Sequence, residues 1–509
     1  MRKIIPALFL LCIGHATHAQ NVGVGQATPL NRLHVTATTD PLRLDGLQSG
    51  TTTDSIVTVN STGVLRKRTL SSVVGTGGWG ITGNSGLSAA TNFLGTSDFI
   101  SLVIRTNNQR SGFIDADSTK RNNSIGFRAM SSTITGNSNN SFGSLALRNL
   151  TSGIGNIAIG DSAIYNVQVG SNNIGIGKNT LFTNNAGTGN IGIGTNTLQN
   201  TVSSENIAIG NNAAVANNVG ANIIAIGANA LQTNQATATH IAVGNNSLKL
   251  LNGGLENVAV GYNAGTSLTT GQYNVLVGNY ALATTTNSNN NTIVGHNSAL
   301  AYTGTGNNNN TFVGYETALT QTSGSGNTFI GYAIDVAPLS SSFSNSTGLG
   351  QGVQITASNQ VRVGNSSVNS IGGQVGWTTF SDERIKKNIM NDVPGLSFIT
   401  LLKPVTYNYD FEKLMRLQNG KKSITLVPSD NPNSGNRFSG FIAQEVEAAA
   451  KSVNYNFSGI DKPANEHSPY GIRYAEMVVP LVKAVQELKS IVDKQQQEIE
   501  QLKAQLKKQ

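Results

Sequence analysis

The sequence predicts a mainly β protein, in which a parallel β-roll or solenoid precedes a small α+β domain that ends in a coiled-coil helix. Three observations predict this. A motif of the form N-x-x-[IVF]-G recurs through the middle of the chain, charged residues become frequent from Ser381 onward, and residues 478–509 carry a heptad pattern of apolar residues.

The repeat is regular in both composition and spacing. Its closing glycines stand at 126, 143, 160, 177, 194, 210, 227, 244, 261, 278, 295, 314 and 331, and ten of the twelve intervals are 17 residues. Alternation in units such as NIAIG predicts two Ile side chains on one face and small Ala or Gly on the other. Each short strand then turns at its glycine, and we expect stacked units to bury their apolar Ile faces in a common core inside a rod with a polar Asn/Thr surface.

These units, over residues 120–365, resemble the left-handed parallel β-roll heads of trimeric autotransporter adhesins, although the step here is longer than is usual in that family. The resemblance implies a homotrimer whose rolls pack side by side. It also implies a surface glycan or a cell-surface receptor as partner. We expect a fibre or adhesin.

The N-terminus resembles a secretory signal at residues 1–19. Arg2 and Lys3 precede an apolar run at 4–13 that contains the chain's single cysteine, Cys12, and small residues follow before Gln20. We therefore expect an exported protein, extracellular or at the cell surface, with no transmembrane segment in the mature chain. Residues 20–119 read as an N-terminal β stalk.

The charge distribution excludes several functions. The net charge is +8, but it accumulates at the two ends of the chain, and we expect no nucleic acid partner. Residues 129–360 hold three bases and five acids: Arg148, Lys178, Lys249, Asp161, Glu205, Glu256, Glu316 and Asp335. Glu205 and Glu256 share one offset but lie three repeats apart, too far for the acid pair of a glycan hydrolase. We expect no metal site and no cofactor.

After a connector at 366–380, residues 381–509 carry eighteen Lys and Arg against fifteen Asp and Glu. A predicted helix here has a coiled-coil seam formed by Leu481, Val485, Leu488, Val492, Gln495, Ile499, Leu502 and Leu506. Branched residues at the first seam position and Leu at the second favour two strands, whereas the β-roll favours three. A single amphipathic helix that packs on its own domain is the alternative.

Three stretches in this domain, SDERIKKNI, GFIAQEVE and YAEMVVPLVKAVQEL, together resemble the intramolecular chaperone domain of phage endosialidases and tailspikes. The resemblance implies a module that assembles three chains and then cuts itself off in one autoproteolytic turnover. Ser381 would be the nucleophile, Lys386 the base and Phe380–Ser381 the cleaved bond, with Asp382 and Arg384 supporting the motif. Ser381 could instead cap a helix. The rival functions are a permanent trimer clamp that does not cleave and a glycan-degrading fibre.

Overall fold

The structure is a computed structural model that describes residues 22–24, 33–35, 56–59, 61–62, 65–68, 87–88, 93–130, 134–339, 341–419 and 431–508. The chain divides into two compact units, residues 1–95 and 96–509. The predicted signal segment, with Cys12, lies outside the described residues.

The first unit contains two small strand pairs. Strand β1 (Val22–Val24) pairs in parallel with β2 (Leu33–Val35), and β3 (Ile56–Val59) pairs antiparallel with β4 (Leu65–Arg68). All four strands lie within the predicted stalk, whose limits remain a prediction.

The second unit begins with a hairpin that closes one end of the solenoid. Strands β5 (Leu102–Thr106) and β6 (Gln109–Ile114) are joined by Asn107 and Asn108, whose φ angles are 48° and 55°. Positive φ at both central residues defines the type I′ turn that suits a two-residue hairpin. Strand β6 then runs antiparallel to the first strand of the solenoid, β7.

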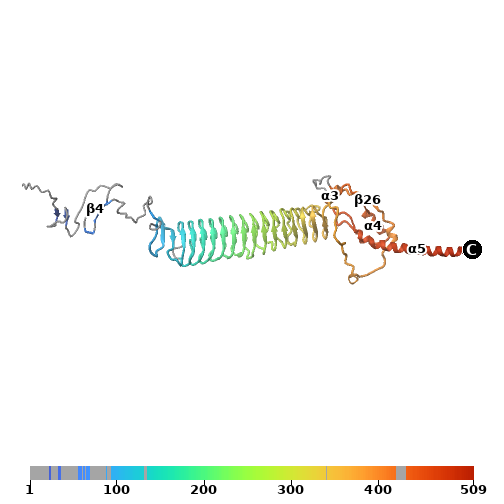
Figure 1. The fold of residues 1–509 in the computed structure, drawn as a ribbon, viewed down its shortest axis with the longest axis horizontal. Helices are drawn as coiled ribbons and strands as arrows, with labels where there is room; N and C mark the ends of the chain where they lie inside the picture. Colours follow the sequence, from blue (N-terminus) through green and yellow to red (C-terminus); the bar gives the residue numbers. More distant parts are fainter. Residues whose placement is uncertain are drawn as a thin grey trace, which may run out of the picture. The chain divides into compact units, whose positions relative to one another are not determined.

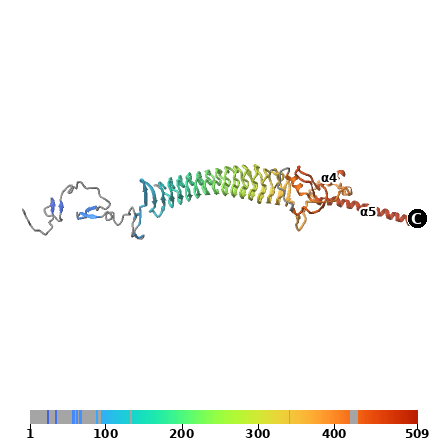
Figure 2. The same cartoon turned by 90° about the horizontal axis from the view of Figure 1, so that it is seen from above.

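The solenoid is a ladder of short parallel strands, as the sequence predicts, and its rungs follow one another along a rod in Figures 1 and 2. Its strands are Asn123–Ile125 (β7), Asn140–Phe142 (β8), Ile157–Ile159 (β9), Ile174–Ile176 (β10), Ile191–Ile193 (β11), Ile207–Ile209 (β12), Ile224–Ile226 (β13), Ile241–Val243 (β14), Val258–Val260 (β15), Val275–Val277 (β16), Thr292–Val294 (β18), Thr311–Val313 (β20), Thr328–Tyr332 (β21), Thr347–Gln351 (β23) and Val361–Val363 (β25). Two further parallel pairs lie beside the ladder: Ser288–Asn289 (β17) with Gly306–Asn307 (β19), and Asp335–Val336 (β22) with Gln354–Ile355 (β24).

The faces of the strands are reversed with respect to the expected core. In β9, Ala158 is fully buried, whereas Ile157 and Ile159 are 37% and 42% exposed. In β9 to β15 this inward residue is Ala or Gly, and a second column of side chains fills the interior from the opposite wall, whereas in later rungs it is a larger residue such as Leu276, Ile293 or Phe312, which is equally buried. Leu181 and Leu198 represent that column, with left-handed φ angles of 51° and 48°. The Ile and Val pairs of the motif therefore face outward.

The motif glycine is required by both its backbone angle and the closeness of the rungs. Gly177 has φ = 132°, and a Cβ at this position would lie 2.3 Å from the carbonyl oxygen of Gly194 on the next rung. No side chain fits in that space, so the motif keeps glycine wherever two rungs meet at this corner.

The motif asparagine is also internal, so the expectation of a polar Asn surface is wrong for this column. Asn173 is fully buried, and its Nδ2 donates to Oδ1 of Asn156 at 3.1 Å and to the carbonyl of Gly187 at 2.8 Å. Its own Oδ1 accepts from the backbone N–H of Asn190 at 3.0 Å. These bonds satisfy polar groups that water cannot reach, and they tie each rung to the next. Ile223 and His240 interrupt the column.

The C-terminal module is a small α+β domain followed by a long helix, as predicted. Its elements are Glu383–Ile385 (η1), Leu396–Ile399 (α2), Val405–Tyr407 (β26), Phe411–Asn419 (α3), Phe438–Gly440 (β27), Ala443–Ser452 (α4), Ile460–Asp461 (β28), Gly471–Ile472 (β29), Tyr474–Met477 (η2) and Val478–Leu506 (α5). Phe398, Val446 and Phe457 form its core, and antiparallel pairs join β26 to β27 and β28 to β29.

The module is hydrogen-bonded to the last turns of the solenoid. Asn465 Nδ2 and Ser468 Oγ both donate to the carbonyl oxygen of Thr356, at 2.8 and 3.1 Å. Asn433 Nδ2 donates to the carbonyl of Ser366 at 3.0 Å. These bonds cover part of the solenoid's final turn, close to its last strand β25.

Helix α5 contacts the module along its first turns, where Glu487 Oε2 accepts a hydrogen bond from the backbone N–H of Leu396 at 2.7 Å. Only Pro480 and Ala484 are buried along it. The seam side chains are exposed instead, from 44% at Ile499 to 71% at Leu506. Within the described chain the predicted seam therefore has no partner, which argues against an amphipathic helix folded on its own domain. Among the described helices, none is both long and apolar enough to cross a membrane.

Candidate functional site

The candidate cleavage motif is a single 3-10 turn held by its own charged residues. Asp382 is the N-cap of η1, and its Oδ1 accepts from the backbone N–H of Arg384 at 2.8 Å. The Arg384 guanidinium also donates to both oxygens of the same carboxylate, at 3.0 Å from Nε and 2.6 Å from Nη2. The cap of this turn is thus Asp382 and not Ser381.

This turn brings the two proposed catalytic side chains together. Lys386 ends η1 in an extended conformation, and its Nζ donates to Ser381 Oγ at 2.8 Å. A separation of five residues would not place two side chains on one face of an α-helix. The tighter 3-10 turn followed by an extended residue does so, because it folds the lysine back over the serine.

The motif's charges are fixed by contacts within the turn. Its hydrogen bonds with Arg384 lower the pKa of Asp382, and the same bonds raise the pKa of Arg384. The carboxylate therefore stays ionised and paired with Arg384, and Lys386 is left to contact the serine. The whole group lies at the surface, since every residue from 367 to 392 is exposed.

The segment around the motif exposes large apolar side chains. Trp377 and Phe380 are 93% and 91% exposed, and Ile385, Ile389 and Met390 are about two-thirds exposed. Such a run of uncovered apolar groups is unusual on a monomeric soluble protein and is typical of a surface that packs against another chain.

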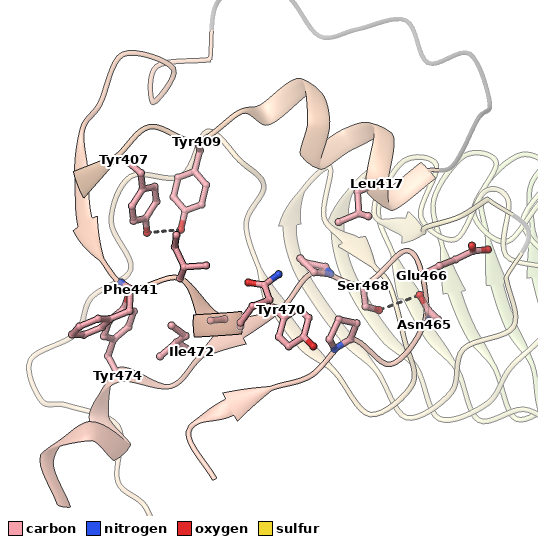
Figure 3. Close-up of a pocket in the computed structure, with 16 residues that line it drawn as sticks. Tyr407, Tyr409, Leu417, Phe441, Asn465, Glu466, Ser468, Tyr470, Ile472 and Tyr474 are labelled. Carbon is pink, nitrogen blue, oxygen red and sulfur yellow. Dashed lines mark hydrogen bonds between the residues drawn. The ribbon is translucent and has the colours of Figure 1, made fainter. Parts of the chain in front are cut away.

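A pocket lies on the body of the module, apart from the motif (Figure 3). This open pocket, of about 620 Å³, is lined in part by Tyr407, Tyr409, Phe441 and Tyr474, and the Tyr407 and Tyr409 hydroxyls lie 3.3 Å apart. Ser381 and Lys386 do not line it. The pocket and the motif are therefore separate features.

The solenoid carries an apolar stripe, which we define as the first and third residues of strands β9 to β16. All sixteen of these residues are Ile or Val, from Ile157 to Val277. They point outward and remain partly exposed, as at Ile209 (36%) and Val275 (40%). The Ile and Val pairs of this stripe are plain in the sequence, but the prediction that they form the core is wrong, because they face outward.

Two further kinds of site are metal-binding clusters and exposed aromatic side chains. Within the described ranges, no group of three or more His, Cys, Asp or Glu side chains could hold a metal ion. Sequence reasoning missed the exposed aromatic side chains that follow several repeat glycines, at Tyr262, Tyr315 and Tyr332. Aligning the repeats on their glycines would have revealed them.

Residues 381–455 match the family described as the chaperone of endosialidase. The match covers the first two of the three stretches that carried the predicted resemblance and ends before helix α5. Comparison with curated proteins and with solved structures finds no match. Fold and family match together describe a parallel β-solenoid followed by an α+β module that is similar, over residues 381–455, to the chaperone of endosialidase.

Proposed function

We propose that this chain is an exported, homotrimeric surface fibre or adhesin whose C-terminal module assembles the trimer and then releases itself by one cut between Phe380 and Ser381. The solenoid is the lasting product, a rod that contacts a glycan or a receptor, and the module is its assembly device.

The apolar stripe is the main observation that supports assembly into a trimer. Eight consecutive rungs present Ile and Val outward on one sheet face, and water would meet all of them in a single chain. Burying such a face against copies of itself removes that apolar area from water at about 25 cal/mol per Å². Identical faces pack symmetrically, and the family of chaperone domains to which the module is similar is typically trimeric.

Two further unpartnered surfaces support the same assembly. The seam of α5 is exposed along its length, and the connector exposes Trp377 and Phe380. Stripe, connector and seam occur in this order along the chain, so three parallel copies would bring each surface against its own counterpart. The seam would hold the copies in register while the slow, non-local pairing of parallel rungs is completed.

The cleavage proposal is supported by the 2.8 Å contact between Lys386 Nζ and Ser381 Oγ together with the family match. In the described arrangement the lysine is the donor, so it must lose a proton before it can act as a base. A lysine becomes an effective base when it is taken out of water. Packing of the exposed connector against other copies is the step that would do this.

The chemistry uses only groups adjacent to the bond. Neutral Lys386 takes the proton of the Ser381 hydroxyl, and Oγ forms a bond to the carbonyl carbon of Phe380. The peptide C–N bond then breaks, and the proton passes from Lys386 to the nitrogen of Ser381. Water hydrolyses the resulting ester, which leaves the carboxylate of Phe380 and a free amine and hydroxyl on Ser381. The reaction occurs once per chain.

A denaturing gel and a native mass measurement on the same preparation test both parts. We expect a fragment of residues 381–509 in the wild type and none in Ser381→Ala or Lys386→Ala. Lys387→Ala is the matched control, since it removes a neighbouring charge and should still cleave. The native mass should correspond to three chains in every case.

The outcomes separate the alternatives. An intact wild-type chain of trimeric mass would reject the cut and favour a permanent clamp. A folded monomer would reject the fibre itself. New reducing ends from incubated polysaccharides would favour the glycan-degrading alternative.

A further inference from the structure

Five aromatic rings follow one another along the solenoid, one on each of five consecutive rungs. We call them the aromatic ladder: Tyr262, Tyr280, His296, Tyr315 and Tyr332. The distances between successive ring centroids are 5.3, 6.3, 5.5 and 5.6 Å, and the last two tyrosines are stacked at 13°. The rings therefore form one unbroken row whose step is close to the spacing of the rungs.

The ladder lies at the surface and is not part of the core. Tyr262, Tyr315 and Tyr332 are 43%, 45% and 50% exposed, and His296 is exposed as well. Contacts between successive rings stabilise the rod, but about half of each of these three tyrosines stays open to solvent, more than ring–ring contact alone requires. The row is more easily explained as a surface for a ligand.

Earlier rungs indicate that this column faces solvent in the assembled rod. Four of the rings directly follow a repeat glycine, and the residues at the same offset in two earlier rungs are Asp161 and Lys178, both exposed. A column that passed through the interface between copies would take both charges out of water, and even a buried pair of opposite charges costs desolvation energy that its attraction often fails to recover. The apolar stripe, by contrast, is free of charge throughout.

The chemistry of the column favours an uncharged, extended ligand. No Lys or Arg occurs between residues 250 and 361, so an anionic polymer would find no cation beside the rings. The nearest acid, Glu316, accepts a hydrogen bond from Tyr315. Amide side chains stand next to the rings, including Asn263 and Asn297, and supply donors and acceptors.

From this geometry we infer that the aromatic ladder is the binding site for a neutral polysaccharide that lies along the rod, with one sugar ring against each aromatic ring. Because neighbouring rings partly cover one another's faces, the sugars would pack their apolar faces along the exposed edges of the rings, and their hydroxyls would bond to the tyrosine hydroxyls and to neighbouring amides. The inference deepens the proposed function by choosing a neutral glycan as the partner. It rests on that proposal only in requiring the column to stay outside the interface between copies.

The test uses the full chain in native gels cast with soluble polysaccharides. The neutral probes are xyloglucan, galactomannan, mixed-linkage β-glucan and dextran, and the anionic probes are polygalacturonate and polysialic acid. We expect at least one neutral polymer to retard the wild type. In the triple variant Tyr262→Asn, Tyr315→Asn, Tyr332→Asn the apparent dissociation constant should rise by about tenfold or more.

Asparagine is the appropriate replacement because the rod already uses it at this offset. Asn211 and Asn245 occupy the equivalent position, and each accepts a bond from the backbone of the preceding rung. The variant should therefore fold, which its melting temperature will verify. The matched control is Tyr165→Ala with Phe182→Ala, a stacked pair elsewhere on the solenoid, and this variant should bind as the wild type does.

Several results would overturn the inference. These are no retardation by any neutral polymer, retardation by the anionic polymers alone, or equal loss in the control. Self-association of the wild type that disappears in the triple variant, without retardation, would make the ladder a contact between proteins. The native mass keeps the two proposals apart, since a trimer that binds no glycan contradicts only the ladder, and a monomer contradicts the fibre.

Discussion

The solenoid and the C-terminal module are stabilised by different kinds of contact. In the solenoid each rung repeats the same few contacts with the next, through backbone pairs, internal Asn bonds and small buried side chains. The module has a compact aperiodic core around Phe398, and every ion pair in the described part of the chain lies in it, between residues 382 and 503.

Under the proposed function, this difference is the reason why the solenoid would need the module to assemble. A repetitive rod has nothing in its contacts to distinguish correct register from a slip by one rung, since Ile174 would pair equally well with several equivalents. The module has unique contacts, so it folds to one structure and can set the register of the chains attached to it. Four predictions test this difference between the solenoid and the module.

The largest effect should come from the seam of α5. In Val485→Asp with Val492→Asp, two charges would enter the proposed interface, and we expect loss of the trimer and an unfolded or aggregated rod. Native mass and circular dichroism provide the measurements. Ser490→Asp with Gln497→Asp, on the opposite side of the same helix, should leave both unchanged. A rod that folds normally without the seam would show that it does not depend on the module.

The next effect separates a glycine of the rod from one of the module. Gly177→Ala places a Cβ 2.3 Å from the next rung at a φ of 132°, and we expect the free energy of unfolding to fall by about 2–4 kcal/mol. Gly435 of the module has no atom within 4 Å of such a Cβ, so Gly435→Ala should be nearly neutral. Denaturant unfolding of both variants makes the comparison, and equal effects would contradict it.

A pH effect should arise at the break in the internal Asn column. Burial lowers the pKa of His240 to about 4, from its ordinary value of 6.5. Between pH 6.5 and pH 4 the unfolded chain binds the proton and the folded chain does not, so stability should fall as the pH falls through this window, by about 3 kcal/mol at its end. Thermal melts at pH 7 and pH 4 measure it.

The matched variant for that effect restores the repeat. Asn occupies the equivalent position on the neighbouring rung at Asn257, so His240→Asn should remove this contribution to the pH dependence without unfolding the rod. If the melting temperature of this variant falls between pH 7 and pH 4 as steeply as that of the wild type, the loss of stability comes from other groups.

The smallest effect should be found at the ion pairs of the module. Arg416 and Glu412 form a 2.6 Å pair four residues apart on α3, and both side chains are more than half exposed. Because solvent screens such pairs, Arg416→Ala should change the free energy of unfolding by less than about 0.5 kcal/mol. A larger loss would mean that the charges of the module contribute more to its stability than this comparison allows.

Much of the fold could be predicted from the sequence because its signals are periodic. Spacing of the glycines located the rungs, and the heptad pattern located the long helix. Alternation alone could not decide which residues of NIAIG face inward, since a strand offers two faces and both faces of this motif carry apolar side chains. The contact of Ser381 with Lys386 was predicted by resemblance, but its cause, a 3-10 turn capped by Asp382, depends on local hydrogen bonds that the spacing does not reveal.

The two ends of the solenoid are covered in different ways, and after the proposed cut they would therefore differ in stability. The hairpin β5–β6 is built into the first rung, whereas the final turn is covered by Asn465 and Ser468, which lie beyond the proposed cut. If the proposed cut releases the module, the final turn of the solenoid loses the residues that cover it, whereas the first rung keeps its hairpin. Local unfolding and proteolysis of the released solenoid would therefore begin at its C-terminal turn and proceed toward the β5–β6 hairpin.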